Sequence, residues 1–166
     1  MAYKVLVVDD QAMPRQLFEN MIKSAENYEL VACIETAKVA DMYCARQQVD
    51  LILMDVVMND DSNGLDVAAK IKESYPKIRI IIMTSMPDAH FLEKAKRIGV
   101  DSFWYKEVQD TSMLEVMDLT MAGEHIYPDK PPVVQLGPTK DTDFTAREMD
   151  VLRKMVEGYT DKEIAD

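Results

Sequence analysis

Cysteine, histidine and long apolar runs are all scarce in this sequence of 166 residues. The two cysteines, Cys33 and Cys44, form no Cys-x-x-Cys pair, and only two histidines are present. These absences favour two reduced, buried thiols over a disulfide bridge or a zinc site. The longest aliphatic stretches, such as residues 5–8 and 51–54, are far shorter than the roughly 20 residues of a transmembrane helix. We therefore expect no membrane span.

Basic residues are also few relative to acidic residues. The chain carries 19 Lys and Arg residues against 30 Asp and Glu residues, which gives a net charge of −11. The deficit holds in both parts of the chain, with a net charge of −7 for residues 1–122 and −4 for residues 123–166. Because non-specific affinity for nucleic acids comes from neutralising phosphates, neither part is a DNA-binding surface as it stands.

The amino terminus lacks the apolar core of a secretion signal. Only four aliphatic residues, at positions 5–8, follow Lys4 before Asp9 and Asp10 interrupt the run. A signal peptide needs about 7 to 15 apolar residues at this place. We therefore expect a cytoplasmic protein.

What is present is an alternation of short aliphatic runs with amphipathic stretches, repeated five times. This alternation predicts an α/β fold in which helices cover both faces of a parallel sheet. The expected strands are residues 4–8, 29–34, 51–54, 78–83 and 102–105, and the expected helices are residues 13–25, 37–47, 65–75, 89–98 and 113–122. We expect a doubly wound, flavodoxin-like sheet of five strands in the order 2-1-3-4-5.

Capping residues mark the ends of two of these helices. Asp88 is suited to be the N-cap of the helix at 89–98, and Gly99 can end it in the left-handed region. Ser112 and Glu115 form a capping box at the start of the last helix.

The composition changes after residue 122. Four of the seven prolines and two of the five glycines lie in residues 123–142, which we interpret as a Pro-rich linker or extended arm. Two capping boxes, at residues 145–148 and 160–163, then predict two short helices. The second has about six residues and cannot be stable alone. We therefore expect three parts, residues 1–122, 123–142 and 143–166, the last an incomplete all-α helix-turn-helix fragment that is cut within its domain.

Acidic residues follow two of the predicted strands where these strands end. Asp9 and Asp10 come after the first strand and Asp55 after the third. Ligands of doubly wound sheets bind at the carboxyl ends of the strands, so these carboxylates should meet at one rim. Two such charges about 4 Å apart repel by roughly 4 kcal/mol at an effective dielectric constant near 20. Mg²⁺ would relieve this repulsion best, because it binds one or two carboxylates, keeps waters and shares its remaining sites with a phosphate.

Two further polar residues end the remaining strands. Thr84 follows the fourth strand and offers a hydroxyl donor, and Lys106 follows the fifth and offers a charge suited to phosphate oxygens. A carboxylate nucleophile, Mg²⁺, a lysine and a hydroxyl are what in-line phosphoryl transfer to an aspartate requires. The alternative for Lys106 is that it only caps a strand.

Four segments resemble the receiver domain of two-component response regulators, in order and at family-like spacing over residues 1 to about 122. They are Val5-Leu6-Val7-Val8-Asp9-Asp10, Leu51-Ile52-Leu53-Met54-Asp55, Ile82-Met83-Thr84-Ser85 and Tyr105-Lys106-Glu107. The resemblance implies that Asp55 accepts a phosphoryl group from a phosphohistidine on a sensor histidine kinase. The implied Mg²⁺ ligands are Asp10, Asp55 and the backbone carbonyl of Val57, with Asp9 assisting through water and with Thr84 and Lys106 holding the phosphoryl oxygens. Gain and loss of phosphate would be self-catalysed, so we do not expect a conventional enzyme.

The loop after Asp55 departs from the family pattern. Receivers commonly have a proline where Asn59 follows Met58, and they reach a glycine eight residues after the acceptor, whereas Gly64 lies nine residues after Asp55. The loop is one residue longer and carries two extra acids, Asp60 and Asp61.

Phe103, three residues before Lys106, stands where receivers carry a switch aromatic. We hypothesise that phosphorylation draws Thr84 toward the phosphoryl group and lets Phe103 turn inward, which biases a two-state surface. Core packing is the alternative role for Phe103.

The end of the chain resembles the start of the helix-turn-helix of NarL/LuxR-type transcription regulators. The segments are Phe144-Thr145-Ala146-Arg147-Glu148, Val151-Leu152 and Lys162-Glu163-Ile164-Ala165. The resemblance covers the first helix and part of the second, and the recognition helix that reads the major groove is absent. It implies a parent protein that binds DNA and a chain that does not bind DNA by itself.

The predicted helix at residues 113–122 is apolar on nearly every side. Met113, Met117 and Met121 form a row, and Glu115 and Asp118 are nearly the only charged residues. Helices of this kind tend to be covered on more than one side. We hypothesise contact with a second subunit, as in a homodimer of phosphorylated chains, or with the Pro-rich segment.

A rival function is that of a Mg²⁺-dependent phosphohydrolase with an aspartyl nucleophile on a related sheet. Such enzymes typically place a general acid two residues after the nucleophile, as Asp-x-Asp, whereas Val57 occupies that position here. Turnover of a small phosphate ester would favour this rival.

Overall fold

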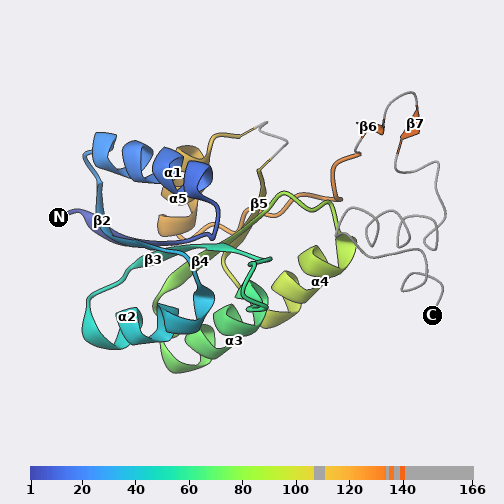
Figure 1. The fold of residues 1–166 in the computed structure, drawn as a ribbon. Coiled ribbons are helices and arrows are strands. Elements are labelled where there is room, and N and C mark those ends of the chain that lie inside the picture. Colours follow the sequence, from blue (N-terminus) through green and yellow to red (C-terminus); the bar gives the residue numbers. More distant parts are fainter. Residues whose placement is uncertain (107–110, 134, 137–138, 141–166) are drawn as a thin grey trace. The chain divides into compact units, whose positions relative to one another are not determined.

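The structure, a computed structural model, describes residues 1–106, 111–133, 135–136 and 139–140 (Figure 1). The chain divides into two compact units, Met1–Pro131 and Pro132–Asp166. In the second unit, strands β6 (Gln135–Leu136) and β7 (Thr139–Lys140) form an antiparallel pair. The predicted helix-turn-helix fragment at residues 143–166 lies outside the described residues.

The first unit is built on a parallel sheet of five strands in the order β2-β1-β3-β4-β5. The strands are β1 (Tyr3–Val8), β2 (Tyr28–Ile34), β3 (Leu51–Asp55), β4 (Arg79–Thr84) and β5 (Ser102–Tyr105). The predicted fold class and strand order are therefore confirmed, and each strand end lies within one residue of the expected position.

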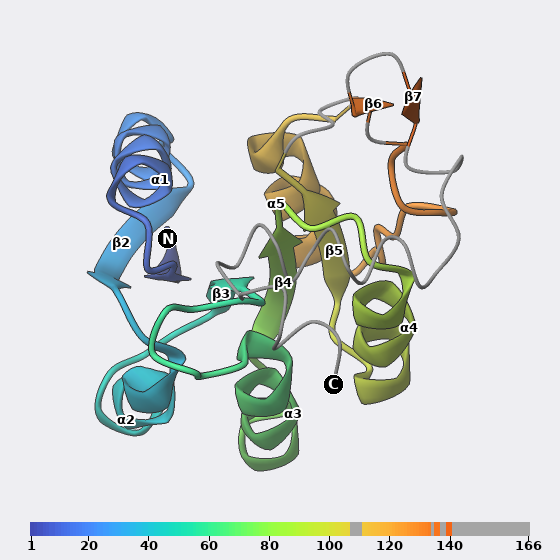
Figure 2. The same ribbon diagram turned by 45° about the vertical axis from the view of Figure 1, so that its right-hand side comes forward.

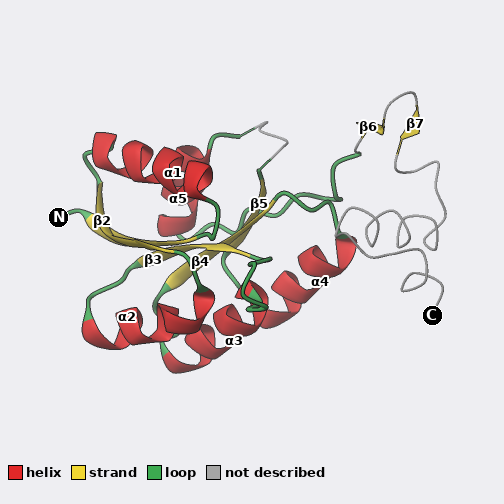
Figure 3. Ribbon diagram, viewed as in Figure 1, coloured by secondary structure: helices red, strands yellow, loops and turns green. Residues whose placement is uncertain are grey.

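Helices alternate with the strands along the chain and cover both faces of the sheet (Figure 3). In the described part of the chain, the α-helices are α1 (Ala12–Ser24), α2 (Ala40–Arg46), α3 (Gly64–Ser74), α4 (Ala89–Ile98) and α5 (Met113–Met121). Helices α1 and α5 lie on one face, and α2, α3 and α4 lie on the other, as the turned view in Figure 2 also shows. None of the described helices is long and apolar enough to cross a lipid bilayer.

The helix expected at residues 37–47 begins differently from the prediction. Its first turn, Ala37–Val39, is a 3₁₀ helix, and the α-helix starts only at Ala40. Thr36 caps this turn by accepting the backbone N–H of Lys38 on its side chain at 3.1 Å. The two helix types have similar side-chain spacing over one turn, so the apolar pattern does not separate them.

The sheet divides the apolar core into two clusters. Leu6 and Val8 of β1 point to the face covered by α2, α3 and α4, whereas Val5 and Val7 point to the face covered by α1 and α5. Successive strand residues face opposite sides, and both sides are covered, which is why the strands read as continuous aliphatic runs. Cys44 is buried in the first of these clusters as expected, whereas Cys33 is only partly buried and packs against the second.

The predicted helix caps are confirmed. The side chain of Asp88 accepts the backbone N–H of His90 at 2.9 Å, and that of Ser112 accepts the backbone N–H of Glu115 at 3.2 Å. Gly99 ends α4 with a φ of 78°, in the left-handed region that glycine adopts without strain.

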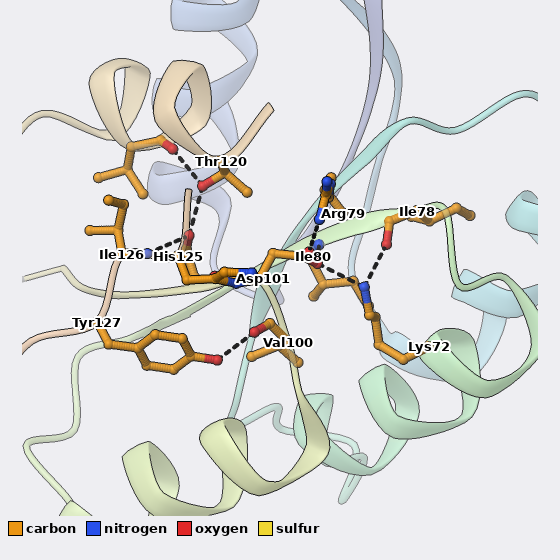
Figure 4. A network of polar contacts seen from close by, with 12 residues as sticks. Lys72, Ile78, Arg79, Ile80, Val100, Asp101, Thr120, His125, Ile126 and Tyr127 are labelled. Carbon is orange, nitrogen blue, oxygen red and sulfur yellow. Dashed lines mark hydrogen bonds and ion pairs between the residues drawn. The ribbon is translucent and has the colours of Figure 1, made fainter. Parts of the chain in front are cut away.

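A short segment after α5, residues 124–127, lies along the edge of β5 and is named the β5 strap here (Figure 4). The backbone N–H of Phe103 donates to the carbonyl of Ile126 at 2.8 Å, and the hydroxyl of Tyr127 donates to the carbonyl of Val100. Ile126 packs against the core cluster beneath α1 and α5, and Tyr127 packs against the opposite cluster. The strap therefore covers the edge of β5 on both faces.

The β5 strap changes the interpretation of the Pro-rich segment. The sequence suggests a linker or arm from residue 123, but the compact unit continues to Pro131. Gly123, with a φ of 98°, turns the chain back from α5 toward β5. Ile126 packs against the same core cluster as the buried residues of α5. The start of the Pro-rich segment therefore contributes to the core beside that helix.

A buried ion-pair network lies at the beginning of β5 (Figure 4). Oδ1 of Asp101 is 2.7 Å from Arg79 Nη1, and its Oδ2 is 2.9 Å from Lys72 Nζ. Burial alone would raise the pKa of Asp101, but the hydrogen bonds from Arg79 and Lys72 outweigh it and lower that pKa. The network ties α3, β4 and β5 together at the end of the sheet opposite to the acidic cluster.

Candidate metal centre

Neighbouring strands β1 and β3 bring three carboxylates together. Val8 of β1 pairs with Met54 of β3, so the acids that follow them end side by side. One carboxylate oxygen from each of Asp9, Asp10 and Asp55 lies within 4.8 Å of the others. Asp9 and Asp55 are buried, and Asp10 is half-buried. The acidic cluster expected at the strand ends is therefore present.

Asp10 has one oxygen that nothing in the described part of the chain satisfies. Its Oδ2 accepts the backbone N–H of Asn59 at 2.7 Å, whereas its Oδ1 is buried without a hydrogen-bond partner among the described residues. A buried oxygen of this kind is costly unless it is paired or binds a metal ion. Three carboxylates with such an oxygen fit a hard divalent cation that takes oxygen ligands.

Lys106 places a positive charge inside the cluster. Its Nζ lies 2.6 Å from Asp9 Oδ2 and 3.2 Å from Asp55 Oδ2. Its side chain is 9% exposed, so the ion pairs are shielded from water. The lysine is therefore held against the carboxylates and is more than a strand cap.

Thr84 lies at the same rim, at the end of β4. Its neighbour Met83 pairs with Asp55, and Thr84 itself pairs with Tyr105, the residue before Lys106. The hydroxyl oxygen of Thr84 accepts the backbone N–H of Met86 at 3.1 Å, which fixes the start of the β4–α4 connection.

The loop that follows Asp55 is closed at its base. Val57, whose carbonyl is a metal ligand by the resemblance to receiver domains, forms an isolated antiparallel bridge with Asn63. The backbone N–H of Gly64 donates to the carbonyl of Val56 at 2.8 Å. The bridge and this hydrogen bond close the loop on the side next to Asp55.

Gly64 lies directly against the backbone of Asp55. A Cβ atom at this position would be 1.8 Å from the carbonyl oxygen of Asp55 and 2.9 Å from Cγ of Met54. No side chain fits there. The glycine is required by close packing at the start of α3, which differs from the conformational role of Gly99.

The environment of Asp55 disfavours its charged form when no metal ion is bound. Burial raises the pKa of the Asp55 carboxyl group to about 6, and Lys106 opposes this increase while Asp9 adds to it. The ionised carboxylate therefore costs stability at neutral pH, and a cation would offset that cost.

We expect Asp55→Asn to stabilise the metal-free protein by about 2 to 3 kcal/mol at pH 7.5. The folded pKa lies above that of an unfolded aspartate, so the cost of the charge is present above about pH 6 and disappears as the pH falls toward about 4. The gain should therefore shrink on acidification. Urea unfolding at pH 7.5 and pH 4.5 measures it, and a gain that is independent of pH would contradict this explanation.

The proposed switch aromatic is part of the core in this structure. Phe103 is 1% exposed, and its ring meets that of Tyr105 edge-on at a centroid distance of 5.0 Å. The hydroxyl of Tyr105 is buried and has no hydrogen-bond partner within the described residues, and burial raises its pKa to about 12. The β5 strap is attached to the backbone of Phe103, so a change at this residue would reach the strap directly.

Sequence reasoning missed several features of the site. It placed Lys106 near phosphoryl oxygens but did not find its ion pair with Asp9. It noted the position of Gly64 only as a spacing and did not reveal its contact with Asp55. The available signal was a glycine, Gly64, at the start of a predicted helix, where no positive φ is needed. Such a glycine indicates close packing against a neighbouring backbone.

Known proteins resemble this chain in sequence. A family model described as the response regulator receiver domain matches residues 5–118. The response regulator protein VraR from Staphylococcus epidermidis is 31% identical over 170 aligned positions, which cover 99% of this chain and 81% of that protein.

Solved structures share the fold. A DNA-binding response regulator of the LuxR family from Staphylococcus aureus is 24% identical, with a TM-score of 0.66 over 72% of this chain and 98% of that one. A structure of two RcsB dimers bound to two parallel DNAs is 18% identical, with a TM-score of 0.70 over 99% of this chain and 82% of that one. At these identities the likeness concerns the fold.

Proposed function

The chain belongs to the response regulator receiver family, and on this basis we propose that Asp55 accepts a phosphoryl group that controls a DNA-binding output domain. The observation that carries the proposal is the meeting of three carboxylates and one ammonium group at one rim of the sheet. Such a site can position an anionic group and neutralise its oxygens, which is most of what phosphoryl transfer needs.

Asp55 is the proposed nucleophile. Its Oδ1 accepts the backbone N–H of Val56 at 2.9 Å, and its Oδ2 faces Lys106. In the transfer, an oxygen of Asp55 forms a bond to phosphorus while the bond from phosphorus to the imidazole nitrogen of the donor breaks. Lys106 would then exchange its contact with the Asp55 carboxylate for a phosphoryl oxygen, and the hydroxyl of Thr84 would donate to another.

The cation of the proposal is Mg²⁺. Asp10, Asp55 and the backbone carbonyl of Val57 would hold it, with Asp9 acting through water. When bound, Mg²⁺ neutralises carboxylates and phosphoryl oxygens together, so that two anions can approach each other. The free oxygen of Asp10 and the raised pKa of Asp55 support this assignment.

The proposed partners follow from family membership. The donor is a sensor histidine kinase, and we place the exchange in the cytoplasm. Phosphorylation would favour a homodimer, and the proposed output is DNA binding by a helix-turn-helix of the kind that residues 143–166 resemble. Proteins that share the fold include a DNA-binding LuxR-family regulator and RcsB dimers bound to DNA, and the proposed output is based on these examples. The proposed chemistry is self-catalysed gain and loss of phosphate on Asp55, so the chain would act as a regulator and not as a conventional enzyme.

Intact-mass spectrometry tests the proposal. After incubation with Mg²⁺ and acetyl phosphate, the wild-type chain should gain the mass of one phosphoryl group, and Asp55→Asn should gain none. Asp41→Asn, in an exposed acid on α2, is the control and should be labelled like wild type. Label that survives Asp55→Asn would place the acceptor elsewhere. Continuous turnover of a small phosphate ester would favour a phosphohydrolase instead.

A further inference from the structure

One backbone N–H occupies one of the two carboxylate oxygens of Asp10. Asn59 donates to Asp10 Oδ2 at 2.7 Å, and this leaves Oδ1 as the buried oxygen without a partner among the described residues. Asn59 is not in a strand or helix but in the loop between β3 and α3. Whatever fixes this loop at Asn59 therefore also fixes the carboxylate of Asp10.

The loop is anchored on both sides of Asn59 to the turn after β2. Before it, the buried thioether of Met58 accepts the backbone N–H of Ala37 at 3.2 Å. After it, the carboxylate of Asp60 accepts the hydroxyl of Thr36 at 2.5 Å. Both anchors reach consecutive residues of the same turn, although the loop and the turn lie more than 20 residues apart in sequence.

The carboxylate of Asp60 is fully engaged within the loop and the turn. Its Oδ1 accepts the backbone N–H of Ser62 at 3.0 Å and the hydroxyl of Ser62 at 2.5 Å. Lys38 Nζ lies 3.3 Å from its Oδ2 and donates to the backbone carbonyl of Asp60 at 2.6 Å. The hydrogen bonds from Ser62 and Thr36 hold the pKa of Asp60 below its usual range. Asp60 is thus a charged anchor, and both of its carboxylate oxygens already have partners in the loop and the turn.

The base and the apex of the loop are held in different ways. The base is closed by the Val57–Asn63 bridge. Beyond the bridge the backbone is irregular, and Asp61 adopts a φ of 61° in the left-handed region. The position of Asn59 in this irregular part therefore depends on side-chain anchors.

We propose that Asp60 is a positioning residue for the metal site: tied to Thr36, it holds the N–H of Asn59 against Asp10 and so keeps the free oxygen of Asp10 directed into the cluster. This inference rests on the proposed function, because it takes the cluster to be a Mg²⁺ site. Loss of an outer-shell partner of a metal ligand typically weakens metal affinity by about 10- to 100-fold. Asp60 acts one residue further away, so the expected loss is about three- to tenfold.

Calorimetric titration with Mg²⁺ alone tests this role in three variants of the full chain. Asp60→Ala removes the anchor. Thr36→Val removes the same hydrogen bond, together with the cap on the N–H of Lys38, without changing the charge. Asp61→Asn is the matched control, because it removes one negative charge from the same loop and asparagine tolerates a positive φ. The thermal midpoint of each metal-free variant shows whether the fold is retained, and Thr36→Val carries the test should Asp60→Ala not fold.

The outcomes separate positioning from charge. About three- to tenfold weaker Mg²⁺ binding in Asp60→Ala and in Thr36→Val, with Asp61→Asn within about twofold of wild type, is the expected result. Equal weakening in Asp60→Ala and Asp61→Asn, with none in Thr36→Val, would show a general charge effect and overturn the inference. Unchanged binding in all three variants would overturn it as well while leaving the proposed function in place. A wild-type chain that binds no Mg²⁺ would overturn both.

Discussion

Replacing Lys106 with methionine should lower the free energy of unfolding of the Mg²⁺-free protein by about 3 kcal/mol at pH 7.5. The ammonium group lies within 3.2 Å of carboxylate oxygens of both Asp9 and Asp55, and all three side chains are at most 9% exposed. Removing one partner of a buried ion pair leaves the other charge without compensation, which is the costly case. Methionine keeps an unbranched apolar side chain, so the change isolates the loss of charge.

This loss should shrink whenever the carboxylates are neutralised by other means. At pH 5 much of Asp55 is protonated because its pKa is raised to about 6, and saturating Mg²⁺ should restore most of the stability at pH 7.5. Urea unfolding at both pH values, with and without Mg²⁺, measures these differences. Lys94→Met is the control, because its ion pair with Asp66 is at the surface and should contribute less than about 1 kcal/mol. An equal loss for Lys106→Met under all conditions would mean that the charge of the carboxylates does not determine the effect.

The second large effect is expected for Gly64→Ala, which should destabilise the protein by roughly 3 to 5 kcal/mol. The added methyl group would lie 1.8 Å from the carbonyl oxygen of Asp55, far inside van der Waals contact. Neither backbone segment can move away easily. Asp55 ends a buried central strand, and the N–H of Gly64 donates to the carbonyl of Val56 at 2.8 Å. Relief of the clash would displace Asp55 itself.

Gly99→Ala separates this clash from the ordinary cost of replacing glycine. At Gly99 the φ is 78° and no heavy atom lies within 4 Å of the added Cβ, so only backbone strain of about 1 kcal/mol is expected. Thermal unfolding compares the two variants, and labelling by acetyl phosphate reports on the acceptor. Gly64→Ala should lose most of the label, whereas Gly99→Ala should keep it. Equal destabilisation by both variants would argue against the contact with Asp55.

The convergence of the acidic cluster was predictable because it depends on chain topology. Parallel strands present all their carboxyl ends at one rim, so an acid directly after an aliphatic run has a known location before any coordinates exist. The positions of Asp9 and Asp55 required only this argument together with the strand order. The helix caps at Asp88 and Ser112 were predictable for a similar reason, since each involves residues only two or three positions apart.

Contacts between loops were not predictable in this way. The hydrogen bond from Thr36 to Asp60 joins two irregular segments whose relative positions depend on the packing of η1 (Ala37–Val39) and α3. In the sequence, Asp60 and Asp61 look like two equivalent extra acids, yet only the first has an anchoring hydrogen bond in the described structure. The prolines after residue 122 suggested a linker and gave no sign that Phe103 would bond to Ile126.

The strap on β5 also determines where this protein can be divided. A fragment that ends at Ala122 would expose unpaired backbone N–H and C=O groups on the edge strand β5. Exposed strand edges tend to pair with strands of neighbouring molecules and form intermolecular sheets. The nine residues up to Pro131 belong to the compact unit and keep that edge closed. An excised receiver should therefore stay monodisperse only when it retains them.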